Sequence, residues 1–245
     1  MLTTRTEILA DGVTLHLGDC LDILGSVNAV DAVVTDPPYG TKTNQRDEWM
    51  IGEFSNVLPL ALPLIRQSLN ADGAFYCFTS WTMMPDWLLR FQQYFKLQNI
   101  IIWDKQKHSG CWTANSWQFT WEGIYFGLKG SRKIRDYLPD IIRSSEHGTR
   151  LPMQKPVDVV SCLIRASTDI GQLILDPFAG TGTTGVAAVN LGRRFTGIEI
   201  EPKYFDIACR RIADALARPS LFIETPARAA RRARGTCRVS TQHHG

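Results

Sequence analysis

An α/β fold, with a mostly parallel sheet covered by helices on both faces, is what the sequence predicts. Short apolar runs suited to buried strands alternate along the chain with stretches of helical periodicity. Strands that alternate with helices form parallel sheets, because each crossover helix packs on one face of the sheet. A glycine-rich turn between two of these runs indicates that the sheet also holds a ligand. The predicted strands are 32–36, 74–79, 99–103, 122–127, 173–176 and 194–199, and the predicted helices are 57–69, 82–96, 155–167, 183–191 and 202–216.

Two parts of the chain fit this alternation less well. Pro59 and Pro63 fall inside the first helical pattern, so we expect that helix to begin late or to kink. Residues 105–150 combine three tryptophans with a basic run. Two interpretations of this segment stay open: an irregular insertion with a solvated charged face, or a surface that contacts the phosphates and bases of a nucleic acid.

The composition indicates a globular protein of one large domain or two small ones. Of the 245 residues, 44% are hydrophobic and 21% are charged, which is ordinary for a soluble chain. The first residues lack the apolar run of a signal peptide, and no apolar stretch is long enough to cross a membrane. The six cysteines form no CxxC pair, and no second pair completes a metal site with His16 and Cys20. We therefore expect a cytoplasmic protein with free thiols and no metal.

The positive charge of the chain is concentrated at its end. The formal net charge is +3, but residues 226–245 carry five arginines and no acid, which leaves the rest of the chain slightly acidic. Overall charge therefore does not demand a nucleic-acid partner, which would have to bind a local patch or the tail. Because residues 223–245 have no hydrophobic period, we expect them to form a disordered basic tail after a domain of residues 1–222.

The stretch VVTDPPYGTK, residues 33–42, ends a predicted buried strand in an unusual way. Two prolines fix the chain direction and donate no backbone hydrogen bond. Asp36 and Tyr39 are therefore presented on a stiff corner. A carboxylate beside an aromatic ring suits the binding of a flat, polar group.

The second informative stretch is LILDPFAGTGTTGVAAVNLGRRFTGIEIEP, residues 173–202. One strand ends at Asp176, the spacing G-x-G-x-x-G follows at Gly180, Gly182 and Gly185, and a second strand ends at Glu199. Glycines let the backbone turn tightly and approach a ligand, and an acid at the next strand end accepts hydrogen bonds from a ribose diol. The pattern predicts a nucleoside-containing cofactor. A nicotinamide dinucleotide is disfavoured, because little chain follows the loop and hydride transfer does not need the Asp-Pro-Pro-Tyr corner.

Together these stretches resemble the beta-class DNA amino-methyltransferases. The resemblance rests on TDPPYG, then QKP, then LDPFAGTGTTGVAA and GRRFTGIEIEPKY, and covers about residues 14–216. It implies a Rossmann-like S-adenosylmethionine-dependent methyltransferase fold in which the catalytic motif precedes the cofactor loop. It also implies that residues 105–150 hold a target-recognition insertion, helped by the loop 40–49.

The resemblance assigns roles position by position. The catalytic motif corresponds to Asp36, Pro37, Pro38 and Tyr39. In LPMQKP, Leu151 stands where the family commonly has His, while Lys155 and Pro156 match. The residues expected at the cofactor are Asp19, Lys155, Asp176, Phe178, Gly180, Thr181, Gly182, Thr183 and Glu199.

The implied chemistry explains the corner. An exocyclic amine is a poor nucleophile because its lone pair is delocalised into the base, and Asp36 and the carbonyl of Pro37 can accept its two N–H bonds. Tyr39 offers a face for stacking the base, which must first be flipped out of the duplex. S-adenosylmethionine supplies the methyl group, so no metal is expected.

The resemblance implies a bacterial or phage-type restriction-modification enzyme that acts on double-stranded DNA as a monomer or homodimer. Because the motif begins with Asp36 rather than serine, the N6 amine of adenine is the favoured target. N4-cytosine methylation, a catalytically silent DNA-binding subunit on the same fold, and action on RNA or a free nucleoside stay open as alternatives.

Overall fold

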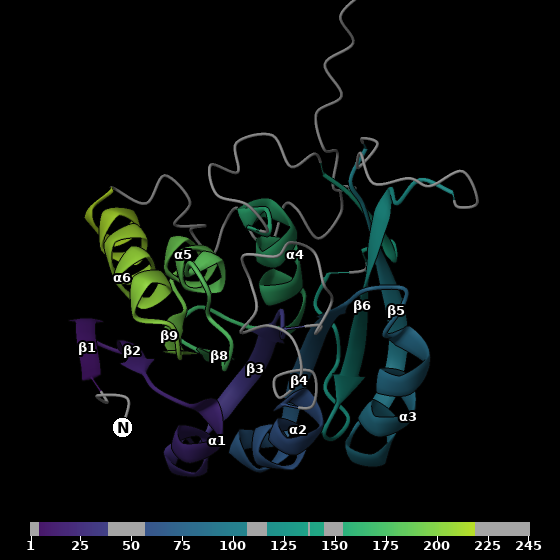
Figure 1. The fold of residues 1–245 in the computed structure, drawn as a ribbon, viewed down its shortest axis with the longest axis horizontal. Helices are drawn as coiled ribbons and strands as arrows, with labels where there is room; N and C mark the ends of the chain where they lie inside the picture. The colour runs from purple at the N-terminus through teal and green to yellow at the C-terminus, as the bar shows by residue number, and fades with distance from the viewer. Residues whose placement is uncertain (1–4, 39–56, 107–116, 137, 145–153, 219–245) are drawn as a thin grey trace, which may run out of the picture.

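The computed structural model describes residues 5–38, 57–106, 117–136, 138–144 and 154–218 (Figure 1). Tyr39, the loop 40–49, Leu151 and the basic tail lie outside these ranges. The strands are β1 Arg5–Ala10, β2 Val13–Leu17, β3 Val30–Thr35, β4 Leu69–Thr79, β5 Lys96–Asp104, β6 Trp121–Leu128, β7 Ile141–Arg143, β8 Leu173–Asp176 and β9 Arg194–Glu199. The helices are α1 Cys20–Ile23, α2 Val57–Ser68, α3 Met84–Tyr94, α4 Val157–Ser167, α5 Thr183–Asn190 and α6 Pro202–Ala217, with a 3-10 turn at Leu24–Ser26.

The predicted α/β fold is confirmed, and each predicted strand and helix is present with small shifts at its ends. Four elements were not predicted from the sequence: β1, β2, α1 and β7. β1 and β2 pair antiparallel around Asp11 and Gly12, an Asp-Gly pair that is itself a hairpin signal. β7 has only three residues, too few for a period to show.

The strands form one nine-stranded sheet in the order β1-β2-β9-β8-β3-β4-β6-β5-β7. β1 and β6 run against the other strands, which are parallel to one another. The chain moves from β3 to β4 on one side and from β8 to β9 on the other, so the order reverses between β3 and β8. In open α/β sheets, ligands bind beyond the carboxyl ends of the strands at such a reversal.

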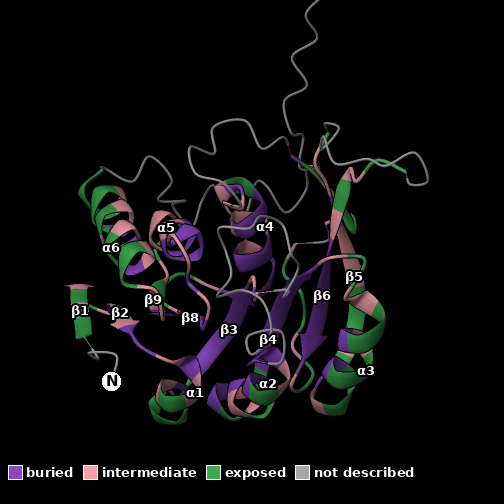
Figure 2. Cartoon of the chain, viewed as in Figure 1, coloured by how far each residue is buried: buried purple, intermediate pink, exposed green. Residues whose placement is uncertain are grey.

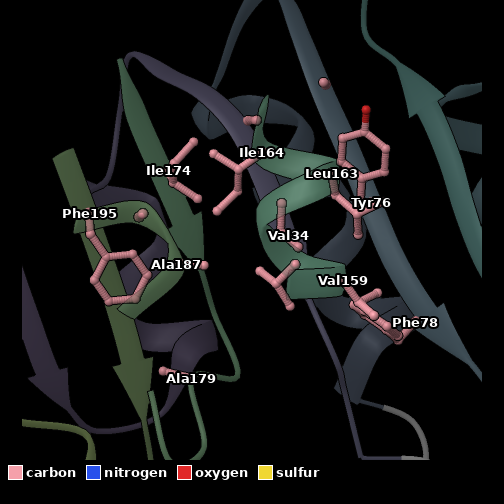
Figure 3. Packing of buried hydrophobic residues seen from close by; sticks show 14 of the residues in the cluster. Val34, Tyr76, Phe78, Val159, Leu163, Ile164, Ile174, Ala179, Ala187 and Phe195 are labelled. Atoms are coloured by element: carbon pink, nitrogen blue, oxygen red, sulfur yellow. The ribbon is translucent and has the colours of Figure 1, made fainter. Parts of the chain in front are cut away.

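Helices cover both faces of the sheet, so each face has its own apolar core. One core joins α1, α2 and α3 to the sheet, and the other joins α4, α5 and α6 (Figure 1). Buried residues follow the central strands (Figure 2). Figure 3 shows Val159 and Leu163 of α4 beside Val34 and Tyr76 of the sheet. Both faces of β3 are therefore covered, which agrees with the apolar run Ala32, Val33 and Val34 at its centre.

The expectation that the first long helix begins late is wrong, while the alternative of a kink at its prolines stays a prediction. α2 runs without interruption from Val57 and includes both Pro59 and Pro63. Pro59 lies in the first turn of the described helix, where the missing N–H costs little. Leu58, Leu62 and other apolar side chains of α2 are buried against the sheet, and this packing stabilises the helix against Pro63.

The segment 105–150 contributes directly to the sheet. Residues 121–128 form β6, which lies between β4 and β5, and residues 141–143 form β7 at the edge. Residues 107–116 and 145–153 are outside the described part of the chain. The target-recognition role of this segment therefore stays a prediction. Among the described residues, no helix has the length and apolar character needed to cross a membrane.

Candidate active site

The predicted catalytic corner begins where β3 ends, at the point where the strand order reverses. β3 is buried along its length, and Asp36 follows it with a side chain that is 28% exposed. Pro37 is buried and Pro38 is partly buried. A carboxylate is thus held at the carboxyl edge of the sheet by a strand that cannot move independently of the core.

Asp176, at the end of the neighbouring strand β8, ties the two strand ends together. Its Oδ1 atom accepts hydrogen bonds from the Thr35 hydroxyl at 2.6 Å and from the Phe178 amide at 3.1 Å. Burial raises the pKa of Asp176 to about 6, although the hydroxyls of Thr184 and Thr35 and the Phe178 amide lower it. The start of the glycine loop is therefore fixed to the end of the strand that carries Asp36.

The glycine loop needs its glycines for two different reasons. Gly180 and Gly182 have φ angles of +52° and +81°, in the left-handed region that other residues rarely adopt. A Cβ at Gly182 would lie 3.0 Å from the Cα of Ala208 in α6, whereas the nearest atom to a Cβ at Gly180 is 4.0 Å away. Gly182 therefore permits close packing of α6, while Gly180 faces open space.

Among the described residues, Glu199 at the end of β9 is held by backbone donors. Its Oε2 accepts the Gly180 amide at 2.7 Å and its Oε1 accepts the Glu201 amide at 2.8 Å. Within the described ranges no cation pairs with it. Burial raises the pKa of the Glu199 carboxyl to about 7, against the lowering effect of the two amides. Each oxygen keeps capacity for a further donor.

The other predicted cofactor residues lie around this loop. Asp19 caps α1 by accepting the Leu21 amide at 2.9 Å, and the preceding Gly18 amide donates to the Glu199 carbonyl at 2.9 Å. Arg211 of α6 donates to the Thr181 carbonyl at 2.5 Å and to its hydroxyl at 2.9 Å, and its Nη1 is 3.4 Å from the Thr183 hydroxyl. The ends of β2, β8 and β9 thus meet with α6 around one loop.

Lys155 lies beside Asp36, in the part of the site that we call the catalytic half; the glycine loop and Glu199 form the cofactor half. Its Nζ atom is 2.6 Å from Oδ2 of Asp36 and 3.1 Å from Oε2 of Glu122. Burial alone would lower the pKa of Lys155, but the carboxylates of Asp36 and Glu122 outweigh it and raise this pKa above its ordinary value. The structure therefore brings Lys155 to the predicted catalytic carboxylate. Its role at the cofactor stays a prediction.

Three residues of the site were not identified from the sequence: Thr35, Glu122 and Arg211. Glu122 had a usable signal, because a single acid near the start of an otherwise buried strand demands a partner. Arg211 had none, since it resembles any other base on an amphipathic helix. Among the described residues there is no cluster of three or more His, Cys, Asp or Glu side chains that could hold a metal.

The assembled site agrees with a family-level match. The family model described as DNA methylase matches residues 30–137 and 112–210 of this chain. The chain belongs to the N6/N4 DNA methylase family. The match covers both halves of this N6/N4 methylase site, from the corner at Asp36 through the glycine loop to Glu199.

Individual members of the family show how far the similarity of this N6/N4 methylase extends. It is 34% identical to the type II methyltransferase M2.DpnII of Streptococcus pneumoniae over 141 residues, which are 49% of this chain and 53% of that protein. It is 27% identical to the DNA adenine methyltransferase YhdJ of Escherichia coli (strain K12) over 81% of this chain and 82% of YhdJ. The crystal structure of an M1.HpyAVI–SAM complex superimposes with a TM-score of 0.63 at 25% identity, covering 80% of this chain and 98% of that one.

Proposed function

We propose that this chain is a site-specific DNA methyltransferase that transfers a methyl group from S-adenosylmethionine to the N6 amine of adenine. The observation that carries the proposal is the position of Asp36. It lies at the reversal of the sheet, beside Asp176 and the glycine loop, and the Thr35–Asp176 hydrogen bond fixes the two strand ends to each other. A polar acceptor is thereby placed next to a nucleoside-type cofactor loop.

The residues of the cofactor half fit S-adenosylmethionine. Its ribose needs an acceptor for two hydroxyl groups, and Glu199 offers a buried carboxylate whose described partners are neutral backbone amides. The cofactor must also approach the backbone of the loop closely. At Gly180 the nearest described atom to a Cβ would be 4.0 Å away, which leaves room for this approach. When bound, S-adenosylmethionine supplies an electrophilic methyl group on a sulfonium sulfur.

The residues of the catalytic half hold the amine. Asp36 and the carbonyl of Pro37 accept the two N–H bonds, which turns the nitrogen lone pair out of the plane of the base. Fixing the amine in line with the methyl group contributes several kcal/mol to the barrier reduction, about 7–11 in the best-aligned intramolecular reactions. Tyr39 lies outside the described residues; its predicted stacking on the flipped base would offset part of the few kcal/mol that flipping costs.

Exposed aromatic side chains at the same edge suit contact with unstacked DNA. Trp81 follows β4, is 51% exposed, and stacks on Phe119 with ring centroids 5.7 Å apart. Trp117 is 94% exposed, and Trp121 begins β6. Bases stack on such rings with little regard to sequence. These aromatics support duplex DNA, rather than a free nucleoside, as the substrate.

Adenine is the proposed target because the motif begins with the acceptor Asp36, and because YhdJ, similar over most of its length, is named a DNA adenine methyltransferase.

The test is transfer of a radiolabelled methyl group to a panel of duplex DNA, RNA and nucleosides, followed by chromatography of the hydrolysed bases. We expect N6-methyladenine from duplex DNA, and sequencing of that DNA gives the target motif. Formation of N4-methylcytosine would instead indicate a cytosine methyltransferase, and label in RNA or nucleosides would indicate a different substrate. Cofactor binding without methyl transfer would indicate a catalytically silent DNA-binding subunit.

A further inference from the structure

Four charged side chains form a continuous chain that starts at Asp36; we name these residues, Asp36, Lys155, Glu122 and Lys105, the charge chain. Lys155 Nζ lies 2.6 Å from Asp36 and 3.1 Å from Glu122. Lys105 Nζ lies 2.6 Å from Oε1 of Glu122. The side chains of Lys155, Lys105 and Glu122 are 11%, 13% and 18% exposed. Each carboxylate and each ammonium group therefore has an opposite charge beside it.

The burial of the charge chain is costly unless its charges balance. An ion pair taken out of water repays its desolvation only with good geometry, and removal of one partner leaves an uncompensated charge. Here two carboxylates face two lysines. Burial opposes ionisation of Glu122, but Lys155 and Lys105 outweigh it and hold the pKa of that carboxyl below its ordinary value. Glu122 is thus kept charged between the two lysines.

The antiparallel direction of β6 puts Glu122 where it is. Most strands of the sheet end at the carboxyl edge, but β6 begins there. Glu122 is its second residue, opposite Trp103 of β5, and the following Gly123 is opposite Thr79 of β4. Lys105 follows the end of β5, and its amide donates to the Thr120 carbonyl at 2.9 Å. Glu122 and Lys105 are therefore both positioned by the sheet.

Lys155, in contrast, belongs to the segment that leads into α4. Its ammonium lies 5.5 Å from the centre of the Phe78 ring, which offers an apolar wall on one side. A flexible lysine of this kind needs fixed charges to hold one position. Asp36 and Glu122 supply them from two different strand ends. An ion pair on one oxygen of Asp36 restricts rotation of that carboxylate.

We propose that Glu122 is a positioning residue: it holds Lys155, and Lys155 fixes the orientation in which the Asp36 carboxylate meets the target amine. Lys105 holds Glu122 from the other side. The inference rests on the proposed function for its catalytic consequence, but the charge chain itself is a feature of the ligand-free protein.

Glu122→Gln tests the inference, since it keeps the shape of the side chain and removes its charge. A loosely held catalytic group can cost up to about 100-fold in rate, so we expect kcat to fall roughly 10- to 100-fold. KM for DNA and for S-adenosylmethionine should stay within about threefold, because neither is bound by Glu122. Glu122→Asp, which keeps the charge, should restore part of kcat. Lys105→Met should give a smaller loss of kcat.

The control is Glu7→Gln, which removes a carboxylate that pairs with Arg5 at 2.8 Å on edge strand β1.

A second measurement does not depend on methyl transfer. Trace acetylation of the ligand-free protein at pH 8, followed by peptide mass spectrometry, reports the fraction of each lysine in the reactive neutral form. Loss of one carboxylate partner should raise the labelling rate of Lys155 about tenfold in Glu122→Gln, if its pKa falls by about one unit. Exposed Lys203 is the internal reference.

The outcomes separate the two proposals. Wild-type protein that transfers no methyl group to any DNA overturns the proposed function. If the wild type is active and Glu122→Gln has an unchanged kcat, the positioning role is overturned. It is also overturned if Glu122→Asp and Glu122→Gln lower kcat equally while the melting temperature stays unchanged. Unchanged labelling of Lys155 overturns the inference whether or not the wild type is active. Should Glu122→Gln fail to fold, Lys105→Met decides by kcat alone, and an unchanged kcat then overturns the inference. The labelling of Lys155 is not used for this variant, because loss of a neighbouring cation does not lower the pKa of Lys155.

Discussion

The two halves of the carboxyl edge hold their buried acids in opposite ways. In the cofactor half, Glu199 is bound by backbone amides, and burial raises its pKa to about 7. In the catalytic half, Glu122 is bound by two lysines, which hold its pKa below the ordinary value. Neutral donors leave a carboxylate able to accept the hydroxyls of an arriving ligand. Two cations restrict the position of a carboxylate and keep it ionised, which suits a residue that positions another side chain. The environment, rather than the residue type, decides which role an acid has.

The largest effect is expected from removal of the acceptor in the catalytic half. Asp36→Ala should lower methyl transfer by about 100- to 10,000-fold, the usual range for loss of a positioned polar catalytic group. S-adenosylmethionine affinity should change only a few-fold, because Asp36 is proposed to bind the target amine and its ion pair is with Lys155, not with Glu199 or the glycine loop. Single-turnover assays and cofactor calorimetry measure the two effects separately. Near-normal turnover by the variant would contradict the proposed role of Asp36.

A next-largest effect is expected at the loop of the cofactor half. Gly182→Ala combines a left-handed φ of +81° with a contact of 3.0 Å to the Cα of Ala208. Strain and overpacking together should cost about 2–4 kcal/mol of the free energy of unfolding. Gly180→Ala, with open space and a φ of +52°, should cost only about 1–2 kcal/mol. Urea unfolding of both variants checks the difference, and equal costs would show that α6 moves to accommodate the methyl group.

Removal of the ligand acceptor in the cofactor half should have a moderate effect on binding alone. Glu199→Ala should weaken S-adenosylmethionine binding roughly 10- to 100-fold, because two hydrogen bonds to a charged acceptor contribute about 1.5–3 kcal/mol each and are not additive. Isothermal calorimetry gives the affinity. Asp214→Ala, an exposed change on α6, is the control. An unchanged affinity would exclude Glu199 as the ribose ligand.

The smallest expected effect concerns pH and stability. The pKa of Glu199 in the folded protein, about 7, lies above its ordinary value, so its contribution to stability is present at low pH and lost as pH rises through about 7. Glu199→Gln should therefore stabilise the ligand-free protein at pH 8 by about 1–2 kcal/mol and leave it nearly unchanged at pH 5.

Thermal unfolding at the two pH values, without ligand, tests this prediction. The wild-type affinity for S-adenosylmethionine should also decrease below pH 7, where the carboxylate becomes protonated, while that of Glu199→Gln should not depend on this step. If Glu199→Gln is less stable than the wild type at pH 8, the hydrogen bonds from the backbone amides to the ionised carboxylate outweigh its desolvation cost.

Local residue patterns were sufficient to predict part of the fold and part of the candidate site. The apolar runs and helical periods predicted β3 to β6, β8, β9 and α2 to α6 with ends shifted by at most five residues, but not β1, β2, β7 and α1. Burial on two faces or on one stripe leaves a direct trace in the residue order. The corner at Asp36 and the loop at Gly180 and Gly182 were visible because prolines and glycines restrict or free the backbone locally. Their order along the chain was enough for the family resemblance.

Which of these groups contact one another could not be predicted from local patterns, because the contacts depend on the assembled sheet. Asp36 and Asp176 are distant in sequence and become neighbours because the strand order reverses between β3 and β8. Lys155 forms an ion pair with Asp36, and Glu122 reaches Lys155 because β6 begins at the edge where most other strands end. No local pattern states strand order or direction, since those depend on how distant segments share one core. The physical reason is that ionic contacts between separate segments form only after the sheet has assembled.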